Sequence, residues 1–431
     1  MAEVDETIKK PNCYRRGAAE HALLIGVATG PTSRSRTEAS LEELGLLARS
    51  AGASVVGTIL QERPRKDPAT LIGRGKVEEL SVRAQEAGAD VVIFDHDLSP
   101  AQQRNLEERL STKTLDRTQL ILDIFAKRAR TREGRLQVEL AQLEYLLPRL
   151  AGKGVLLSRL GGGIGTRGPG ETKLETDRRR IRQRIQAVRR DIERVRRHRG
   201  TRRAARQRSE QAVVALVGYT NAGKSTLFSA LTRAEAGISD QLFMTLDPLV
   251  RRARLGPGLD VLLVDTVGFI QKLPHGLVAA FRATLEEVVQ ADLLLHVQDA
   301  SAPDLDEREA SVNTVLEEIG AAEKPPRVVV LNKSDRLDAE QALRAQQGRP
   351  EGVLVSAHTG HGLEDLRQLL IRRLWLGRKP VRLRFSSADA RGIAGVYSAG
   401  KVVVHEVHGD EVRIEAELPE RLLERYREHL T

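Results

Sequence analysis

Short apolar runs alternate with longer amphipathic stretches over the first quarter of the chain. The runs ALLIGV at 22–27, SVVGTIL at 54–60 and DVVIFD at 90–95 are rich in Val, Ile and Leu, as buried strands are. Strands that alternate with helices are typical of a sheet whose neighbouring strands run parallel. The pattern predicts a small α/β unit with a parallel sheet that ends near residue 125.

Two helix starts are predicted, one between the first two strands and one after the third. Ser40 with Glu43 matches the capping box, in which two side chains satisfy unpaired backbone N–H groups at the start of a helix. Ser99, with Pro100 and Gln102 after it, matches the same pattern. One helix is therefore expected to begin at Ser40 and another at Ser99.

The hydrophobic spacing changes after residue 125 to the alternation of four and three that is typical of paired helices. Two such stripes flank the glycine-rich segment GGGIGTRGPGET at 161–172. Each helix alone would be marginal in water, so we expect an antiparallel helical hairpin over 126–209 with 151–171 at its tip. Pro148 should stop or kink the first helix near this end. The stripes consist of Leu136, Leu140, Leu143, Leu147 and Leu150, and of Ile181, Ile185, Val188, Ile192 and Val195.

The stretch VVALVGYTNAGKST at 213–226 joins a β-branched strand to a glycine-rich loop and a helix. Its Gly218, Gly223, Lys224 and Ser225 have the spacing of a P-loop, whose backbone N–H groups surround nucleotide phosphates. The lysine adds a positive charge beside the β- and γ-phosphates, and the serine hydroxyl can ligate Mg²⁺. On its own this motif is compatible with ATP as well as GTP.

Polar residues at three further strand ends complete a nucleotide site. VLLVDTVGF places Asp265 where it can hold a Mg²⁺-bound water, and Gly268 where its N–H can meet the γ-phosphate. VVVLNKSD supplies Asp335, whose carboxylate can accept from both N1–H and the exocyclic amine of guanine, a donor pair that adenine lacks. VLVSAHTG offers a backbone N–H for the guanine O6 at 356–358. The four pieces in this order predict a site for GTP.

In these motifs residues 212–370 resemble the Ras-like GTPases of translation factors. The resemblance implies that Thr245, in FMTLDP, completes Mg²⁺ coordination and contacts the γ-phosphate. Phe269 stands where Ras-like enzymes carry a glutamine that orients water, and an apolar ring cannot do so. Asn221 resembles the asparagine of GTPases that use K⁺ in place of an arginine finger. We expect slow hydrolysis assisted by K⁺ and by a partner; the alternative is a phosphate-loop residue without a metal role.

The predicted roles overlap on a small set of residues. The catalytic candidates are Lys224, Thr245, Gly268 and Asn221, and the Mg²⁺ ligands are Ser225, Thr245 and, through water, Asp265. The predicted nucleotide contacts are Gly218, Tyr219, Thr220, Asn221, Ala222, Gly223, Lys224, Ser225, Thr226, Phe243, Met244, Thr245, Leu246, Asp247, Asp265, Thr266, Val267, Gly268, Asn332, Lys333, Ser334, Asp335, Ser356, Ala357 and His358.

Charge and composition point to a polyanionic partner. The net charge is +10, from 69 Lys and Arg against 59 Asp and Glu. The run 178–208 places Arg between the apolar positions of the second helix, and contact with phosphates is favoured here over a solvated helix face. Aromatic residues make up only 3%, so base stacking is not expected to dominate. With Cys13 as the single cysteine and no apolar run of about 20 residues, we expect a cytoplasmic protein without disulfides or membrane spans.

The glycine-rich segment itself has GxGxxG spacing at Gly163, Gly165 and Gly168. A dinucleotide site needs a strand before the first glycine and a helix soon after the third, whereas here a helical stripe precedes the loop and Pro169 follows it. We therefore expect the loop to bring its backbone close to a folded polyanion. The candidate RNA contacts are Arg159, Arg167, Lys173, Arg178 and Arg179.

Near the end of the chain, VRLRF at 381–385, KVVVHEV at 401–407 and EVRIEAEL at 411–418 alternate as strands do. A last amphipathic helix is expected to carry Leu422, Leu423 and Tyr426. The predicted fold is α/β, with a P-loop GTPase domain between an α/β N-terminal domain with a helical hairpin and a small α+β domain. The expected divisions are 1–125 for the N-terminal α/β domain, 126–209 for the hairpin, 210–374 for the Ras-like GTPase domain and 380–431 for the C-terminal α+β domain.

Four long stretches carry a more specific resemblance, and they are LIGRGKVEEL (71–80), DLSPAQQRNLE (97–107), DRTQLILDIFAKRARTREGRLQVELAQLEY (116–145) and SRLGGGIGTRGPGETKLETDRRRI (158–181). Together with the GTPase motifs they resemble the HflX family over nearly the whole chain. The resemblance implies a ribosome-associated GTPase whose N-terminal domain and hairpin tip enter the large (50S) subunit near its peptidyl-transferase region. It implies a role in splitting or rescuing stalled or stressed 70S ribosomes.

The same resemblance implies a second nucleotide at the N-terminal domain, for which Lys76 in IGRGK is the candidate residue. A plain helix start at this position is the alternative. A GTPase of ribosome assembly or tRNA modification, and a non-catalytic RNA-binding scaffold, remain open as other functions of the whole chain.

Overall fold

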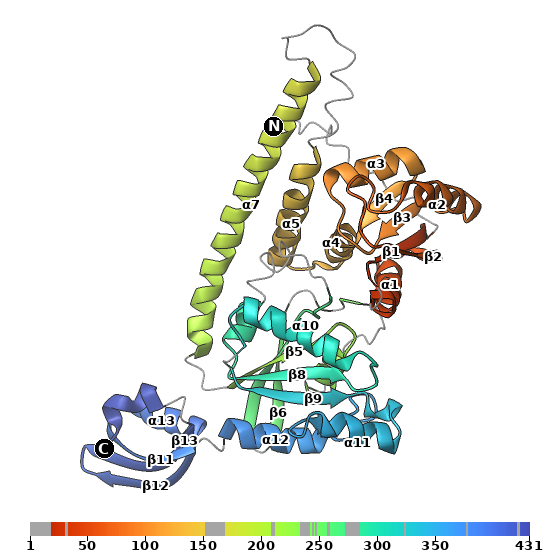
Figure 1. Cartoon of the computed structure of the whole chain (residues 1–431). Helices are drawn as coiled ribbons and strands as arrows, with labels where there is room; N and C mark the ends of the chain where they lie inside the picture. Colours follow the sequence, from red (N-terminus) through yellow and green to blue (C-terminus); the bar gives the residue numbers. More distant parts are fainter. Residues whose placement is uncertain are drawn as a thin grey trace. The chain divides into compact units, whose positions relative to one another are not determined.

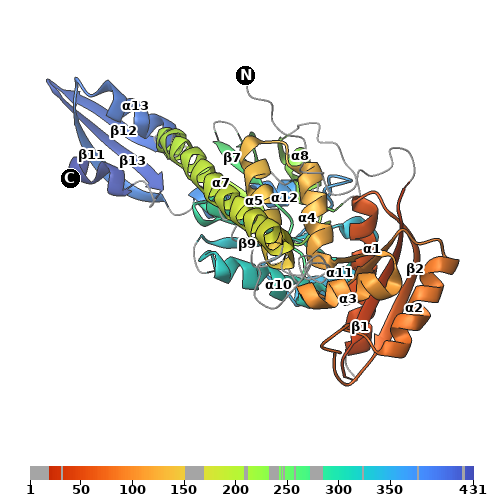
Figure 2. The ribbon, with the colours of Figure 1, turned by 90° about the horizontal axis from the view of Figure 1, so that it is seen from above.

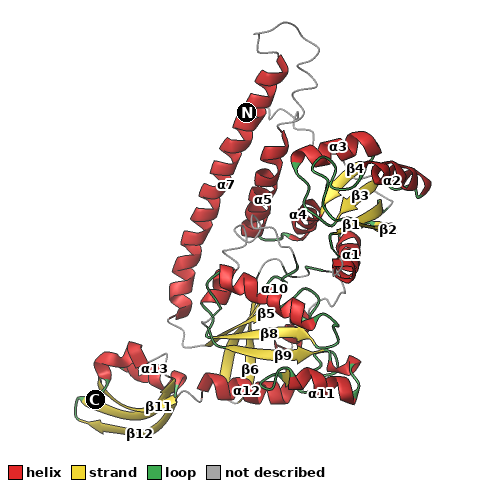
Figure 3. Cartoon of the chain, in the orientation of Figure 1, coloured by secondary structure: helices red, strands yellow, loops and turns green. Residues whose placement is uncertain are grey.

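Figure 1 shows the computed structural model of the chain, and Figure 3 shows its strands gathered in three separate sheets. The structure describes residues 19–30, 33–150, 169–207, 212–232, 242–243, 245, 248–256, 259–271, 285–322, 325–375, 378–419 and 423–431. The chain divides into two units, residues 1–124 with 145–179 and residues 125–144 with 180–431.

The sheet of the first unit consists of β1 (His21–Ala28), β2 (Ser54–Glu62), β3 (Val91–Phe94) and β4 (Lys113–Asp116), with helices α1 (Ser33–Ser50), α2 (Arg74–Glu86) and α3 (Pro100–Leu110). Helix α4 (Arg117–Arg128) begins in this unit, and its residues from Phe125 onward belong to the second. The strand order is β2-β1-β3-β4 and all neighbours run parallel, which confirms the predicted parallel sheet. The central strands β1 and β3 are buried along nearly their whole length. Strand β4 was not predicted, because its sequence KTLD contains a single large apolar residue.

One of the two predicted helix starts is confirmed and the other is wrong. Ser99 caps α3, accepting a hydrogen bond from the N–H of Gln102 at 3.2 Å, and Gln102 completes the capping box. Ser40 instead lies inside α1, which begins seven residues earlier. The Ser40 side chain is buried and donates to Asp95 Oδ2 at 2.8 Å. Ser40 therefore does not cap a helix; its hydroxyl makes a buried hydrogen bond from α1 to Asp95, just after β3.

Helices α5 (Arg132–Arg149) and α7 (Pro169–Gln207) carry the two predicted stripes. Figures 1 and 2 show them side by side with opposite chain directions, and Arg184 and Arg189 of α7 pair with Glu139 and Glu144 of α5. Helix α5 ends one residue after Pro148, as predicted. On α7 the stripe residues Ile185, Val188 and Ile192 are buried. The Leu stripe of α5 is only half-buried, and its fully buried residues include Val138 and Ala141 instead.

The second sheet consists of β5 (Ala212–Val217), β6 (Leu249–Gly256), β7 (Leu259–Asp265), β8 (Leu293–Asp299), β9 (Arg327–Asn332) and β10 (Val353–Leu354) in the order β10-β9-β8-β5-β7-β6. Every neighbouring pair runs parallel except β6 with β7. Its helices include α8 (Lys224–Thr232), α10 (Leu305–Glu318), α11 (Ala339–Gln347) and α12 (Leu363–Trp375). Because β5, β7, β8 and β9 are parallel, their carboxyl ends meet at one edge, which is where ligands bind in such sheets.

The third sheet lies at the C-terminal end and consists of β11 (Arg378–Ser386), β12 (Lys401–His408) and β13 (Glu411–Pro419), antiparallel in the order β11-β13-β12, with α13 (Ala390–Ala399). The three predicted strands are confirmed, whereas α13 was not predicted. The expected last helix is a 3₁₀ helix over Glu424–His429 with Tyr426 buried, and Leu422 lies outside the described residues. Among the residues that the structure describes, no helix is long and apolar enough to cross a membrane.

Candidate functional site

The loop between β5 and α8 has a conformation that requires its glycines. Gly218 has φ +149°, and a Cβ there would lie 2.1 Å from the Val297 carbonyl oxygen. Gly223 has φ +90°, and a Cβ there would lie 2.2 Å from Asn332 Nδ2. Since α8 begins at Lys224, its first backbone N–H groups lack partners within the helix and can bind an anion. The loop therefore has the backbone of a phosphate-binding site.

A cavity of about 60 Å³ adjoins this loop. It is lined, among the described residues, by Thr220, Asn221, Gly223, Lys224, Ser225, Thr226, Phe243, Thr245, Thr266 and Gly268. Lys224 is buried, and its Nζ donates to the carbonyl oxygens of Gly218 at 3.1 Å and Tyr219 at 2.8 Å. Burial lowers the pKa of Lys224 to about 8, and the Asp265 carboxylate opposes this shift. A phosphate in the cavity would likewise favour the charged ammonium.

All three predicted metal ligands meet beside this cavity. Ser225 Oγ and Thr245 Oγ1 each donate to Asp265 Oδ2 at 2.7 Å, and the two hydroxyl oxygens are 3.0 Å apart. The other carboxylate oxygen, Asp265 Oδ1, is buried without a hydrogen-bond partner. Burial raises the pKa of Asp265. Hydroxyl and carboxylate oxygens are the donors that Mg²⁺ prefers, and an unsatisfied oxygen among them suits a cation or its bound water.

The residues of the guanine motif have two different structural roles. Asn332 is buried; its Nδ2 donates to the Ala222 carbonyl oxygen at 2.8 Å and its Oδ1 accepts from the Ala357 N–H at 3.0 Å. It thereby joins the phosphate-binding loop to the loop after β10. Asp335 is exposed, and its Oδ1 accepts from Ser356 Oγ at 2.5 Å. This hydrogen bond is the main cause of the lowered pKa of Asp335, so the carboxylate is ionised and available to donors of a base.

Lys333 has a partner that the sequence did not reveal. Its Nζ lies 2.7 Å from Asp299 Oδ2, and both side chains are largely buried. Asp299 ends β8, next to β9 in the sheet, so the ion pair joins two neighbouring strand ends. A polar residue at the end of a buried strand was the available signal, but without a motif around it Asp299 did not stand out.

Phe269 pairs its backbone with the phosphate-binding loop. Its carbonyl oxygen accepts from the Thr220 N–H at 2.6 Å, and its N–H donates to the Gly218 carbonyl oxygen at 3.1 Å. Two residues later, the N–H of Gln271 donates to the Tyr219 hydroxyl at 2.8 Å. The Phe269 side chain is buried and does not line the cavity with the described residues. The position that holds a glutamine in Ras-like enzymes therefore serves packing here.

Phe243, two residues before Thr245, is held by an aromatic contact. Its φ is +58°, unusual for a residue with a side chain, and its ring is buried. The ring centroid lies 4.5 Å from that of Phe125 in α4, at an interplanar angle of 58°. Phe125 was not predicted, since nothing in its helical pattern indicates a partner 118 residues later. Met244, Leu246 and Asp247 lie outside the described residues.

The predicted RNA contacts fall largely outside the described residues. Arg159, Arg167 and the side chain of Lys173 are among those not described, whereas on α7 Arg178 is half-buried and Arg179 exposed. At the other predicted site, Lys76 Nζ lies 2.8 Å from both carboxylate oxygens of Glu79 in the same helix. A second nucleotide at Lys76 remains a prediction.

Three family models match successive parts of the chain: "GTP-binding GTPase N-terminal" over residues 38–126, "GTP-binding GTPase Middle Region" over 128–206, and "50S ribosome-binding GTPase" over 213–333. GTPase HflX of Caldanaerobacter subterraneus subsp. tengcongensis is 47% identical over 408 residues, or 95% of this chain and 93% of that protein. GTPase HflX of Escherichia coli is 48% identical over 362 residues, or 84% of each.

Solved structures resemble the chain more remotely. A GTP-binding protein from the archaeon Sulfolobus solfataricus, crystallised with GDP, is 24% identical, with a TM-score of 0.44 over 82% of this chain and 98% of that one. By contrast, the sequence identity to the two HflX proteins is near one half over most of the chain. It shows that the chain, with its P-loop for a guanine nucleotide, belongs to the HflX family of GTPases.

Proposed function

We propose that this GTPase binds the large ribosomal subunit and splits or rescues 70S ribosomes that are stalled or stressed. The match of residues 213–333 to a family of 50S ribosome-binding GTPases supports the proposal. The basic surface of α7, with the exposed Arg179, suits contact with the phosphates of ribosomal RNA. We place the protein in the cytoplasm, where ribosomes are.

The observation that carries the nucleotide part of the proposal is the meeting of Ser225, Thr245 and Asp265 within 3.0 Å of one another. The loop N–H groups and Lys224 would hold the phosphates of GTP, and Asp335 would accept the two guanine donors. Mg²⁺, bound by the two hydroxyls and through water by Asp265, would offset the charge that develops on the phosphates during hydrolysis.

Thr245 would make the site sensitive to the state of the nucleotide. Its hydroxyl already lies beside Ser225 and Asp265. Contact between Thr245 and the γ-phosphate of GTP would hold the hydroxyl in this position. The Gly268 N–H would meet the same phosphate, and a Cβ at Gly268 would lie 2.9 Å from the Cα of Thr220, so only glycine leaves room. Loss of the γ-phosphate would release both contacts and with them the ribosome-engaging conformation.

Asn221 lines the cavity, is exposed and has φ +59°. We propose that it helps to bind K⁺, which would supply positive charge where Phe269 provides no polar group. GTP turnover measured in K⁺ and in Na⁺ buffers of equal ionic strength tests this role. Faster turnover in K⁺, lost in Asn221→Ala, is expected; equal rates in the two buffers would contradict it.

The decisive experiment measures GTP turnover in K⁺ buffer with and without purified 70S ribosomes and large subunits, beside a sedimentation profile. Stimulated turnover together with a shift of 70S particles towards subunits is expected. Turnover that ignores ribosomes would overturn the proposal and favour assembly precursors or tRNA as partner. Ribosome binding with no turnover at all would favour a scaffold.

A further inference from the structure

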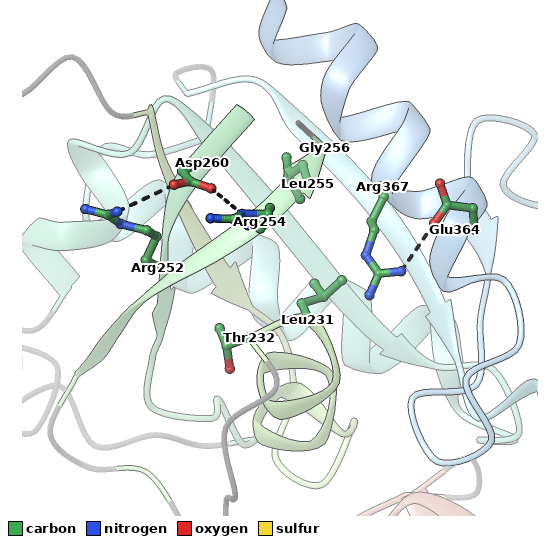
Figure 4. A pocket seen from close by; sticks show the side chains of 9 residues that line it. All are labelled: Leu231, Thr232, Arg252, Arg254, Leu255, Gly256, Asp260, Glu364 and Arg367. Carbon is green, nitrogen blue, oxygen red and sulfur yellow. Dashed lines mark hydrogen bonds and ion pairs between the residues drawn. The ribbon is translucent and has the colours of Figure 1, made fainter. Parts of the chain in front are cut away.

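A second cleft opens on the GTPase sheet at the far end of α8 from the phosphate-binding loop. Its volume is about 660 Å³, and Figure 4 labels the described residues that line it. Helix α8 begins at Lys224 in the nucleotide cavity, and its last residue, Thr232, lines the cleft. Nine helical residues span about 12 Å, and the two sites share no described lining residue. The cleft is therefore separate from the nucleotide site.

Arginines dominate the charge of this cleft. Arg252 and Arg254 come from β6 and Arg367 comes from α12, whereas Asp260 and Glu364 are the acidic residues. Figure 4 shows Arg252 and Arg254 on either side of Asp260 and Arg367 reaching from α12. One carboxylate thus serves two guanidinium groups, and the described lining carries a net charge of +1, from three arginines against two carboxylates.

The ion pairs inside the cleft are loose. Arg252 and Arg254 each lie 3.5 Å from Asp260, longer than the 2.7–2.9 Å that is typical of charge-assisted hydrogen bonds. Their side chains are 63% and 79% exposed. Arg367 lies 3.3 Å from Glu364. Each guanidinium carries five N–H donors, so the exposed Arg252 and Arg254 keep donors open to a ligand, whereas the Arg367 side chain is only 23% exposed.

The position of β6 at the edge of the sheet explains the arginines of that strand, but it does not explain Arg367. β6 is the edge strand of its sheet, and charged side chains on an edge prevent unwanted pairing with other strands. This role would be met by Arg251, Arg252 and Arg254 along the strand. It does not require Arg367, from a helix more than 100 residues later, to face the same cleft.

We propose that this arginine cleft, defined by Arg252, Arg254 and Arg367, binds the phosphodiester backbone of structured RNA. Guanidinium groups match phosphate oxygens in charge and geometry. The described lining contains no aromatic residue, so the cleft offers no surface for stacking a base or nucleoside. Its volume of about 660 Å³ leaves room for a stretch of backbone, and the net charge of +10 favours RNA over a basic or neutral partner. The inference rests on the proposed function, because a protein bound to the large subunit contacts ribosomal RNA.

The test compares Arg252→Gln/Arg254→Gln with Arg251→Gln as the matched control. Arg251 is equally an exposed arginine of β6, but it does not line the cleft, and its Nη1 donates to the Val250 carbonyl oxygen. Arg367→Gln tests the α12 side independently. Dissociation constants for large subunits, and for large-subunit RNA freed of protein, are measured with a GTP analogue across a series of salt concentrations. GDP affinity of each variant serves as the folding control.

The double variant is expected to bind both targets about 10-fold or more weakly at low salt, with a slope of log K against log salt that is less steep by about 1 per arginine. Arg367→Gln should reduce the slope by about 1, and Arg251→Gln should match the wild type. Equal affinity and slope in all variants would overturn the inference while leaving the proposed function intact. A loss on subunits but not on free RNA would assign the cleft to an acidic protein and also overturn it. Absence of wild-type binding would instead contradict the proposed function itself.

Discussion

At the scale of single residues, the guanine motif separates a structural amide from a binding carboxylate. Asn332 is 2% exposed and both ends of its amide are bonded to backbone. Asp335, three residues later, is exposed and keeps most of its acceptor capacity. The sequence predicted both residues as nucleotide contacts, because the motif gives their order but not the direction of each side chain. Asp299, the partner of Lys333, depends on the neighbouring strand and so was not predictable from the motif.

Asp335→Asn should change base preference without changing the fold. The substitution replaces an acceptor of two guanine donors by an amide that can accept only one and donates another. Loss of a charge-assisted pair costs about 1.5–3 kcal/mol, so GTP affinity should fall about 10- to 100-fold and xanthosine triphosphate should gain. Competition between GTP and xanthosine triphosphate for the protein measures this change in base preference. Asp365→Asn, at an exposed carboxylate of α12, is the control, and unchanged preference in Asp335→Asn would refute the assignment.

At the scale of elements, the buried face of a helix was predictable where its apolar residues lie on one face, and was not where buried residues lie on two faces. The stripe of α7 was identified because the buried apolar residues of its described part, Ile185, Val188 and Ile192, share one face. On α5 the half-buried Leu stripe and the buried Val138 and Ala141 occupy different faces, so a single stripe could not describe it. The wrong helix start at Ser40 has a similar cause, since a hydroxyl that bonds across elements resembles a cap in sequence.

The contact between α4 and Phe243 should affect hydrolysis more than binding. Phe125→Leu keeps an apolar side chain but removes the ring pair, which is worth about 0.5–1.5 kcal/mol. Because Phe243 is two residues from Thr245, the Thr245 hydroxyl should lie less often beside Asp265. We expect GTP turnover to fall about 2- to 10-fold with GDP affinity nearly unchanged. Phe94→Leu, at an equally buried ring of β3, is the control, and equal turnover in the two variants would contradict the expectation.

At the scale of the whole molecule, a buried histidine should make stability depend on acid. His296, in the middle of the six-stranded sheet, is 1% exposed, and its Nδ1 has no hydrogen-bond partner. Burial lowers its pKa to about 3, with smaller contributions from Arg327, Arg349 and Lys224. In the unfolded chain the imidazole returns to its ordinary pKa near 6.5. Below that pH the unfolded state binds a proton that the folded state excludes, so stability falls as pH falls from about 6.5 to 3.

Between pH 7 and pH 5 this difference should cost the wild type about 2 kcal/mol of unfolding free energy. His296→Gln should lose correspondingly less stability over the same interval. Urea unfolding followed by the fluorescence of Trp375, the single tryptophan, which lies on α12 in the same domain, measures it. His408→Gln, at an exposed histidine of β12, should behave as the wild type. Parallel pH profiles of the wild type and His296→Gln would show that another group causes the acid sensitivity.

The two hydrogen bonds of Asn332 limit which ligands can contact both loops of the nucleotide site. One amide fixes the phosphate-binding loop at Ala222 and the base-reading loop at Ala357, so the span between the two loops is set before any ligand arrives. A ligand must therefore fit in length as well as in hydrogen bonding, because a guanine and a pyrophosphate separated by anything other than one ribose cannot reach both loops at once. The fixed spacing of the two loops therefore selects the ligand by its length.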